Sequence, residues 1–188
     1  MFERYWEIKR ARQRLMHKGY IACALKIWVS IMLLSGCTEK SSYDTPTITV
    51  TIEPLRYFTE QIAADRFKVV TMVPQGGSPE TYEPSAQQMA ALAHSSLYIK
   101  VGEIGFERTW TKRLQDNAPH CLFINASEGI EPLSTPHGHA DPHTWMSTKN
   151  ARLMAQNIFK ALCQVNTADS ALFRQNLNTL LATIDSVD

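Results

Sequence analysis

The stretch PHGHADPHTW places three histidines, His137, His139 and His143, close together in the chain. Imidazole nitrogens and carboxylate oxygens both bind zinc and similar divalent ions. His139 and His143 would share one face of a helix, but a glycine and a proline within the stretch oppose a helix. The sequence therefore predicts a loop here, and that loop could bind metal, supply a base, or be merely hydrophilic.

A second polar loop, GGSPETYEP, carries Glu80 and Glu83. Either carboxylate could bind a metal ion or simply be solvated. The chain contains neither the G-x-S-x-G motif of serine hydrolases nor the H-E-x-x-H motif of zinc proteases. We therefore expect no enzymatic activity.

Alternating strands and helices are expected to position these two loops. β-branched or apolar segments predict four strands, and segments with helical spacing of apolar residues lie between them. This pattern predicts an α/β fold with a parallel four-stranded sheet flanked by helices. The predicted strands are Thr47–Ile52, Phe67–Val73, Ser96–Gly102 and Cys121–Ser127, and the predicted helices cover 54–65, 86–95 and 106–117.

Ligands of open α/β sheets bind beyond the carboxyl ends of the strands. The loop with Glu80 follows the second predicted strand, and the histidine loop follows the fourth. Both loops should open on the same edge of the sheet. We therefore expect Glu80 and His143 to face one another although they are far apart in sequence.

The rest of the chain is predicted to be helical, with Ser147 capping one helix and Thr167 capping the next. The second of these helices carries an apolar stripe and has no stop signal near the end of the chain. Such a stripe needs a partner surface, so the chain is expected to be the front part of a larger protein. The stripe consists of Phe173, Leu177, Leu180 and Ile184.

The start of the chain has the pattern of a secretory signal peptide. Basic residues precede a short apolar run, and the run ends in LSGC, residues 34–37. This ending is typical of a bacterial lipoprotein signal, in which Cys37 takes the lipid. We expect a lipid-anchored, extracytoplasmic protein. Cys121 and Cys163 could pair in an oxidising compartment or remain buried thiols.

The overall charge excludes one broad class of partner. The formal net charge is only +1, whereas nucleic-acid-binding proteins usually carry a strong basic excess. No nucleic-acid partner is expected.

Two segments resemble a known family. GGSPETYEPSAQQMAALAHSSLYIKVGEIGFE resembles the front lobe of the metal-binding proteins that serve bacterial zinc and manganese ABC importers. DPHTWMSTKNARLMAQNIFKAL resembles the segment that ends that lobe. With LSGC ahead of them, the resemblance covers nearly the whole chain from Thr47 onward.

The resemblance implies two α/β lobes that are joined by a long helix and bind a metal ion between them. His143 matches a histidine ligand of the family, whereas Glu80 stands where the family usually has histidine. Glutamate still binds zinc, although manganese and iron(II) also suit this pair. His137 and His139 resemble a short form of the histidine-rich loop of the zinc proteins and are expected to gather metal transiently.

The resemblance also implies a division of the chain. Residues 1–36 would be the signal peptide, 37–46 a tether, 47–146 the metal-binding lobe and 147–188 the helical segment that leads into the interlobe helix, with the second lobe absent. The implied function is to capture a divalent ion, with zinc expected, and to deliver it as a monomer to an ABC permease. An adhesion or structural lipoprotein and a non-functional truncated remnant are the alternatives.

Overall fold

The computed structural model describes residues 45–102, 104–131 and 141–187. The expected signal peptide, the predicted lipidation site Cys37 and most of the expected tether lie outside the described residues, as do His137 and His139. No helix in the described ranges is both long enough and apolar enough to cross a membrane.

Four parallel strands form one sheet, as predicted, and their order in the sheet is β2-β1-β3-β4. They are β1 (Thr47–Val50), β2 (Lys68–Thr71), β3 (Ser95–Lys100) and β4 (Leu122–Asn125). The chain moves outward from β1 to β2 and then returns to the other side of β1 for β3. The adjacent β1 and β3 therefore mark the point where the strand order reverses, which is where ligands of such sheets bind.

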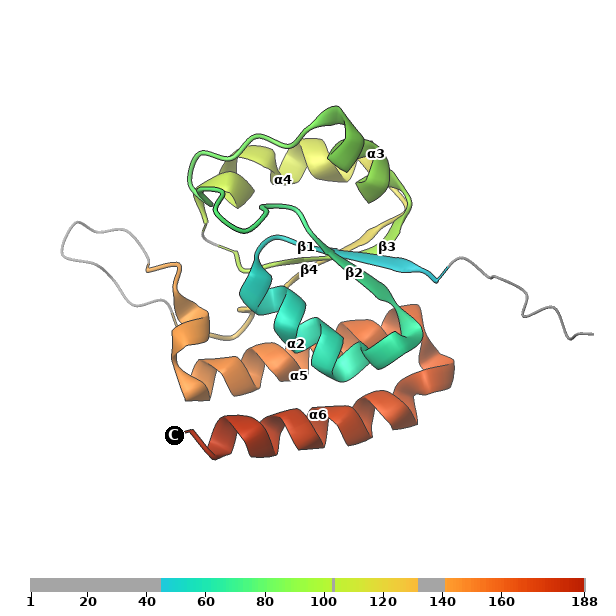
Figure 1. The fold of residues 1–188 in the computed structure, drawn as a ribbon, viewed down its shortest axis with the longest axis vertical. Coiled ribbons are helices and arrows are strands. Elements are labelled where there is room, and N and C mark those ends of the chain that lie inside the picture. The colour runs from blue at the N-terminus through green and yellow to red at the C-terminus, as the bar shows by residue number, and fades with distance from the viewer. Residues whose placement is uncertain (1–44, 103, 132–140, 188) are drawn as a thin grey trace, which may run out of the picture. The chain divides into compact units, whose positions relative to one another are not determined.

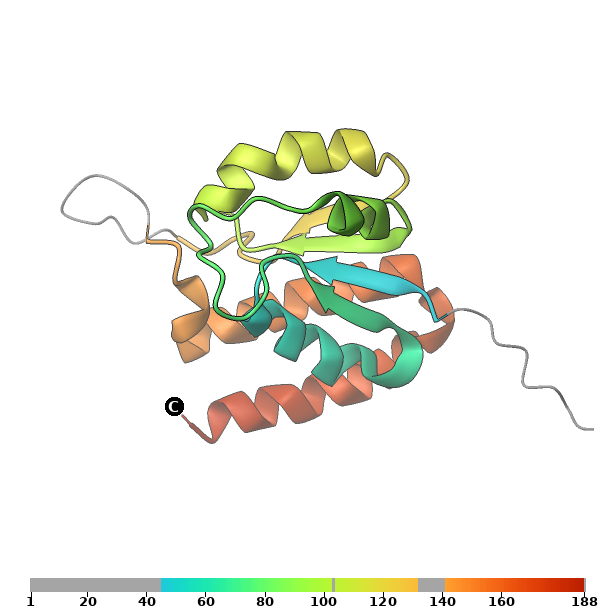
Figure 2. The ribbon, with the colours of Figure 1, turned by 45° about the horizontal axis from the view of Figure 1, so that its top comes forward.

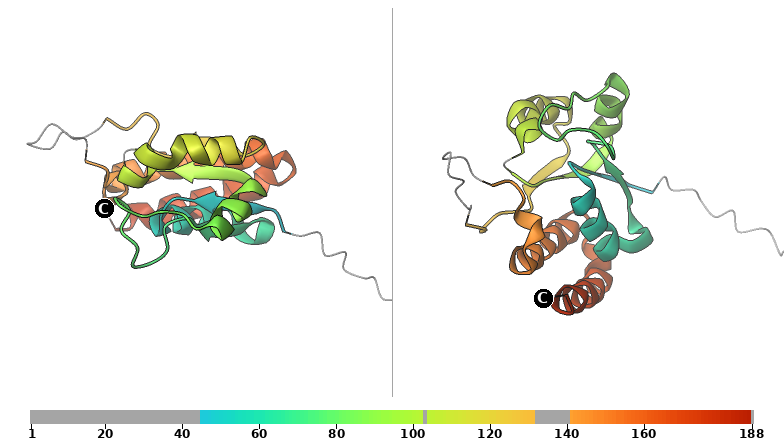
Figure 3. Two further views of the ribbon diagram at one scale, coloured as in Figure 1. Left: turned by 90° about the horizontal axis from the view of Figure 1, so that it is seen from above. Right: turned by 60° about the vertical axis from the view of Figure 1, so that its left-hand side comes forward.

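Helices cover both faces of the sheet (Figure 1). On one face lie α3 (Ala86–Ala93) and α4 (Gly105–Asn117), and on the other lie α2 (Glu53–Ala63) and α5 (Thr148–Val165). The last helix, α6 (Ser170–Asp185), lies against α2 and α5 rather than against the sheet (Figures 1 and 2). The view in the right panel of Figure 3 separates these layers. The predicted α/β class and parallel sheet are confirmed.

The core is built from the two faces of the central strands. Ile48 and Val50 of β1 are completely buried, as are Leu97 and Ile99 of β3. The polar residues within this core are paired: the hydroxyl oxygens of Thr49 and Ser95 are 2.7 Å apart, and those of Thr51 and Tyr98 are 2.9 Å apart. Because buried polar groups are costly unless they are hydrogen-bonded, these pairs fix how β1 and β3 sit side by side.

The apolar stripe of α6 is buried within this chain. Its four residues, named above, are each at most 7% exposed. Asn176 of α6 donates a hydrogen bond to the carbonyl of Ile62 in α2, and Arg152 of α5 pairs with Asp185. The expectation that the stripe needs a partner surface outside the chain is therefore wrong, since α2 and α5 supply that surface.

The two predicted helix caps have different outcomes. Ser147 occupies the N-cap position of α5, but its side chain makes no capping hydrogen bond. Thr167 is not a cap: it is the first residue of a 3₁₀ turn that precedes α6, and its hydroxyl donates to the carbonyl of Cys163. The side chain of Asn166 accepts the hydrogen bond from Asp169 N–H instead. Asparagine is at least as favourable as threonine at the N-cap position. The sequence pattern alone therefore did not show whether Asn166 or Thr167 would be the cap.

Cys121 and Cys163 are both free, half-buried thiols. They therefore form no disulfide. Burial raises the pKa of Cys121 to about 12. A thiol with such a pKa stays protonated near neutral pH and is a poor metal ligand and nucleophile.

Candidate metal site

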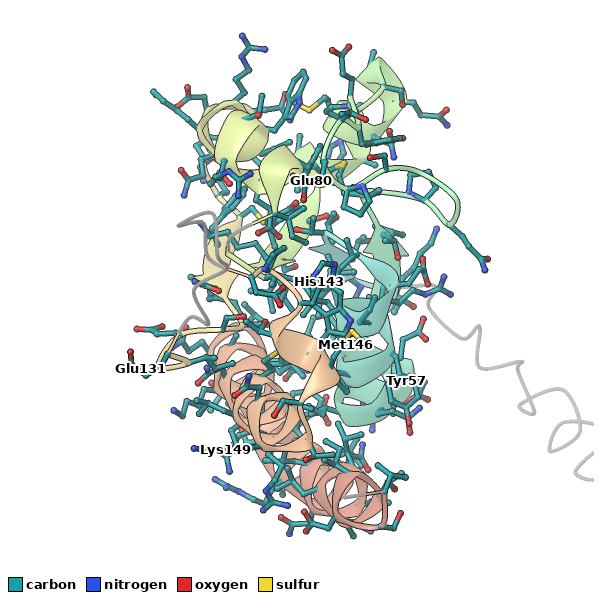
Figure 4. All side chains as sticks on the ribbon, turned by 90° about the vertical axis from the view of Figure 1, so that its left-hand side faces the viewer. Tyr57, Glu80, Glu131, His143, Met146 and Lys149 are labelled. Atoms are coloured by element: carbon teal, nitrogen blue, oxygen red, sulfur yellow. The ribbon has the colours of Figure 1, made fainter. Side chains whose placement is uncertain are left out.

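A pocket of about 330 Å³ lies across the carboxyl ends of the strands. Segments that follow each of the four strands contribute to it: Ile52 after β1, the loop from Val73 after β2, Ile104 after β3 and Trp145 after β4. Glu80 and His143 both line this pocket. Figure 4 shows the two side chains at the same end of the molecule. The expectation that the two loops open on one edge of the sheet is confirmed.

Glu80 is held by the packing of its loop against α4. The N–H of Phe106 donates to the carbonyl of Pro79 at 2.9 Å, and the N–H of Gly105 donates to the carboxylate of Glu80 at 3.1 Å. Two residues further on, the ring of Tyr82 packs on Phe106 with centroids 6.1 Å apart. The loop is thus anchored at the start of α4, and Glu80 receives the partial positive charge of that helix terminus.

The far end of the same loop is fixed by α3. The hydroxyl of Tyr82 donates to the side-chain oxygen of Gln88, and the side-chain nitrogen of Gln88 donates to the carbonyl of Met72 at the end of β2. Ser85 and Gln88 also form a reciprocal capping box at the start of α3. Together with the contacts to α4, these bonds hold the loop on both sides of Glu80, so its backbone position is well defined.

His143 lies between β4 and α5. The hydroxyl oxygen of Thr144, the next residue, lies 2.9 Å from that of Ser127, which follows β4. The carbonyl of His143 accepts a hydrogen bond from the N–H of Met146. The ring of Trp145 lies 5.3 Å from the imidazole, centroid to centroid. The imidazole is therefore positioned by residues on both sides of it in the chain.

Asp141 determines which nitrogen of His143 is available. Its Oδ1 lies 2.8 Å from Nδ1 of the imidazole and accepts the backbone N–H of His143 at 2.9 Å. These contacts, the backbone bond first, lower the pKa of the Asp141 carboxyl. With Nδ1–H donated to the carboxylate, Nε2 is the nitrogen left to bind a metal. A carboxylate behind the imidazole is the usual outer partner of metal-binding histidines.

Other charged groups surround the pocket. Arg108 of α4 lies 3.6 Å from Glu80 Oε2, and Glu53 of the pocket wall is paired with Arg56. Behind the pocket, the buried carboxylate of Glu107 accepts the backbone N–H groups of Val101 and Gly102. Burial raises the pKa of Glu107 more than these hydrogen bonds lower it.

Among the described residues, no group of three or more histidine, cysteine, aspartate or glutamate side chains is close enough to hold a metal ion. The site seen here therefore contains two candidate ligands from this lobe, Glu80 and His143, which share a pocket. His137 and His139, the accessory candidates, lie outside the described residues.

Sequence reasoning missed Arg108 and the role of Asp141. Asp141 belongs to the DPH motif, so its position next to His143 was visible, but the hydrogen bond depends on the turn that the backbone makes there. Arg108 lies on a helix distant in sequence from Glu80, and no spacing rule connects the two.

The comparison with family models decides the family of this chain. The model described as "Zinc-uptake complex component A periplasmic" (ZnuA) matches residues 48–188. The chain belongs to the ZnuA family. The match begins within β1 and runs through α6, so it includes both candidate ligands.

Individual relatives and solved structures are also similar to this chain. The manganese ABC transporter substrate-binding lipoprotein PsaA of Streptococcus pneumoniae is 27% identical over 183 residues, which are 89% of this chain and 59% of that protein. A crystal structure of ZnuA is 35% identical with a TM-score of 0.72, over 76% of this chain and 56% of that one. Zinc-bound AdcA of Streptococcus pneumoniae is 26% identical with a TM-score of 0.68, over 77% and 31%. The chain thus spans between 31% and 59% of the length of these three proteins.

Replacing Asp141 with asparagine is expected to weaken zinc binding about tenfold, since outer partners of metal-binding histidines typically contribute this much. Asparagine keeps an oxygen near Nδ1 but removes the charge that strengthens the imidazole as a donor. Calorimetric zinc titration measures the change. Glu128→Gln, which removes an equal charge from an exposed residue outside this pocket, is the control, and equal affinities of the two variants would contradict the role of Asp141.

Proposed function

We propose that this chain forms the front lobe of an extracytoplasmic metal-binding lipoprotein that captures a divalent ion and delivers it to the permease of an ABC importer. The observation that carries the proposal is the orientation of His143 by Asp141 at a pocket that Glu80 also lines. Membership of the ZnuA family supports the transport role. The ion is cargo, and no bond chemistry is involved.

His143 is proposed to bind the ion through Nε2, and Glu80 through a carboxylate oxygen. Zinc is the proposed ion because an imidazole and a carboxylate are ordinary zinc ligands. The same donors accept manganese and iron(II), and the related PsaA is named for manganese. A competition titration with these ions therefore belongs in the first experiment.

The remaining parts of the proposal follow the family resemblance. Cys37 is the proposed lipid attachment site, since relatives are named as lipoproteins, and His137 and His139 are proposed to gather metal near the pocket. The proposed boundaries are those given above: signal peptide, tether, lobe of residues 47–146 and helical segment of residues 147–188. The protein would act as a monomer, and further ligands would come from a second lobe. Two ligands from one lobe predict weak binding.

Glu80→Gln is expected to lower the zinc affinity of the full chain about tenfold, because the amide removes the negative charge but keeps the size of the side chain. Isothermal titration with zinc, followed by competition with manganese, measures this. Glu83→Gln in the same loop is the matched control. If the unaltered chain binds no zinc, manganese or iron(II), the proposal fails, and an adhesion lipoprotein or a remnant becomes the better interpretation.

A further inference from the structure

The carboxylate of Glu80 is already engaged by positive charge on α4. Its Oε2 accepts the N–H of Gly105, the first residue of α4, at 3.1 Å and lies 3.6 Å from Nη2 of Arg108 one turn further along. Both contacts use the same oxygen, so Oε1 takes part in neither of them. One side chain of the candidate site is thus bound to a cation before any metal arrives.

The close approach of Glu80 to α4 depends on the residue type at position 105. A Cβ atom there would overlap Glu80 Oε2 and would lie 2.9 Å from the carbonyl oxygen of Glu80. Real Cβ atoms do not come so close to backbone atoms, so only glycine permits this contact. Glycine at position 105 therefore lets the fold hold Glu80 against the start of α4, one turn before Arg108, which lies 3.6 Å from its carboxylate.

Arg108 and a metal ion compete for the same negative charge. A metal ion at Glu80 would lie within several ångströms of the guanidinium, and two cations at that distance repel one another. The side chains of Arg108 and Glu80 are 58% and 54% exposed, so water screens both the attraction and the repulsion. The expected effect on metal affinity is therefore moderate, roughly three- to tenfold.

We propose that Arg108 is the residue that sets the metal affinity of this site, by holding Glu80 on α4 and opposing its transfer to the ion. Arg108 is a positioning residue, since it acts through Glu80 and does not bind the ion. The inference rests on the proposed function and deepens it. A carboxylate that is shared with an internal cation binds its cargo less tightly, which favours release to the permease.

The test measures zinc affinity by calorimetry in the full chain and in Arg108→Gln. Removing the charge is expected to tighten binding roughly three- to tenfold. Lys112→Gln, one turn further along α4, removes the same charge from a lysine paired with Asp116 and should change the affinity by less than about twofold, because water screens this more distant charge. Arg108→Lys keeps the charge and should stay near the unaltered affinity.

Two additional measurements show whether Arg108 acts through Glu80. In the Glu80→Gln background, Arg108→Gln should no longer tighten binding. In the unaltered chain, the Gly105 amide resonance should shift as zinc is added, because the carboxylate leaves that N–H.

The inference is overturned if Arg108→Gln binds zinc equally or more weakly, or if Arg108→Lys binds as tightly as Arg108→Gln. It is also overturned if the gain persists without Glu80 or if the Gly105 resonance does not move. These outcomes, combined with a large loss of affinity on removing His143, would leave the proposed function standing. If the unaltered chain binds none of zinc, manganese and iron(II), both the inference and the proposed function fail.

Discussion

Zinc binding should weaken by at least about 100-fold when His143 is replaced by alanine. The carboxylate of Asp141 orients the imidazole of His143 so that its other nitrogen is free to bind the ion. Replacing such a hydrogen-bond partner of a metal-binding histidine typically lowers metal affinity by about 10- to 100-fold. Losing the ligand itself must cost more than losing its partner. The measurement is a zinc titration in the full chain, with a competing metal-sensitive dye to extend the range to weak binding.

The control for this variant is His120→Ala. His120 is an exposed histidine two residues before β4, at the opposite edge of the sheet from the pocket, so its removal tests any non-specific contribution of surface imidazoles. Its affinity should be unchanged. An unaltered zinc affinity in His143→Ala, with a folded protein by circular dichroism, would rule out the metal site and with it the transport function proposed here.

Phe173→Ala is expected to lower the free energy of unfolding by about 3–5 kcal/mol, the usual cost of removing a fully buried phenylalanine. Phe173 on α6 is completely buried, and its ring lies 6.3 Å from that of Phe67, centroid to centroid. A loss of this size would demonstrate that α6 is part of the folded core in solution. Chemical denaturation followed by circular dichroism gives the value.

Tyr57→Ala is the matched control, because it removes an aromatic ring that is 48% exposed on α2. Its cost should stay below about 1 kcal/mol, since about half of the residue remains in water in the folded chain and its removal leaves no enclosed cavity. If Phe173→Ala were as mild as Tyr57→Ala, α6 would not be packed on α2 and α5 in solution.

The sheet and the shared pocket could be predicted because both follow from local patterns and one general rule. Apolar, β-branched segments indicated the strands, and parallel strands bring their carboxyl ends to one edge, which placed Glu80 and His143 together. The partners of these two residues could not be predicted in the same way. Arg108 reaches Glu80 only because the loop lies against the start of α4, and that contact depends on packing in three dimensions.

The apolar stripe of α6 shows a second limit of prediction from the sequence. Its spacing correctly indicated a buried face, but periodicity says nothing about which surface buries it. The surface is formed by α5, which directly precedes α6, and by α2, which is distant in the chain. A pattern on one element therefore predicts that burial occurs, and the partner must come from the structure.

The two candidate ligands are braced by opposite layers of the fold. Glu80 is hydrogen-bonded to the start of α4 on one side of the sheet. Thr144, next to His143, is hydrogen-bonded to Ser127 after β4 and contacts Met154 of α5 on the other side. The separation of the two backbone segments that carry the ligands is therefore set by how these layers pack, and packed interiors resist compression. Discrimination between ions of different radius would consequently be sensitive to substitutions deep between the layers, far from either ligand.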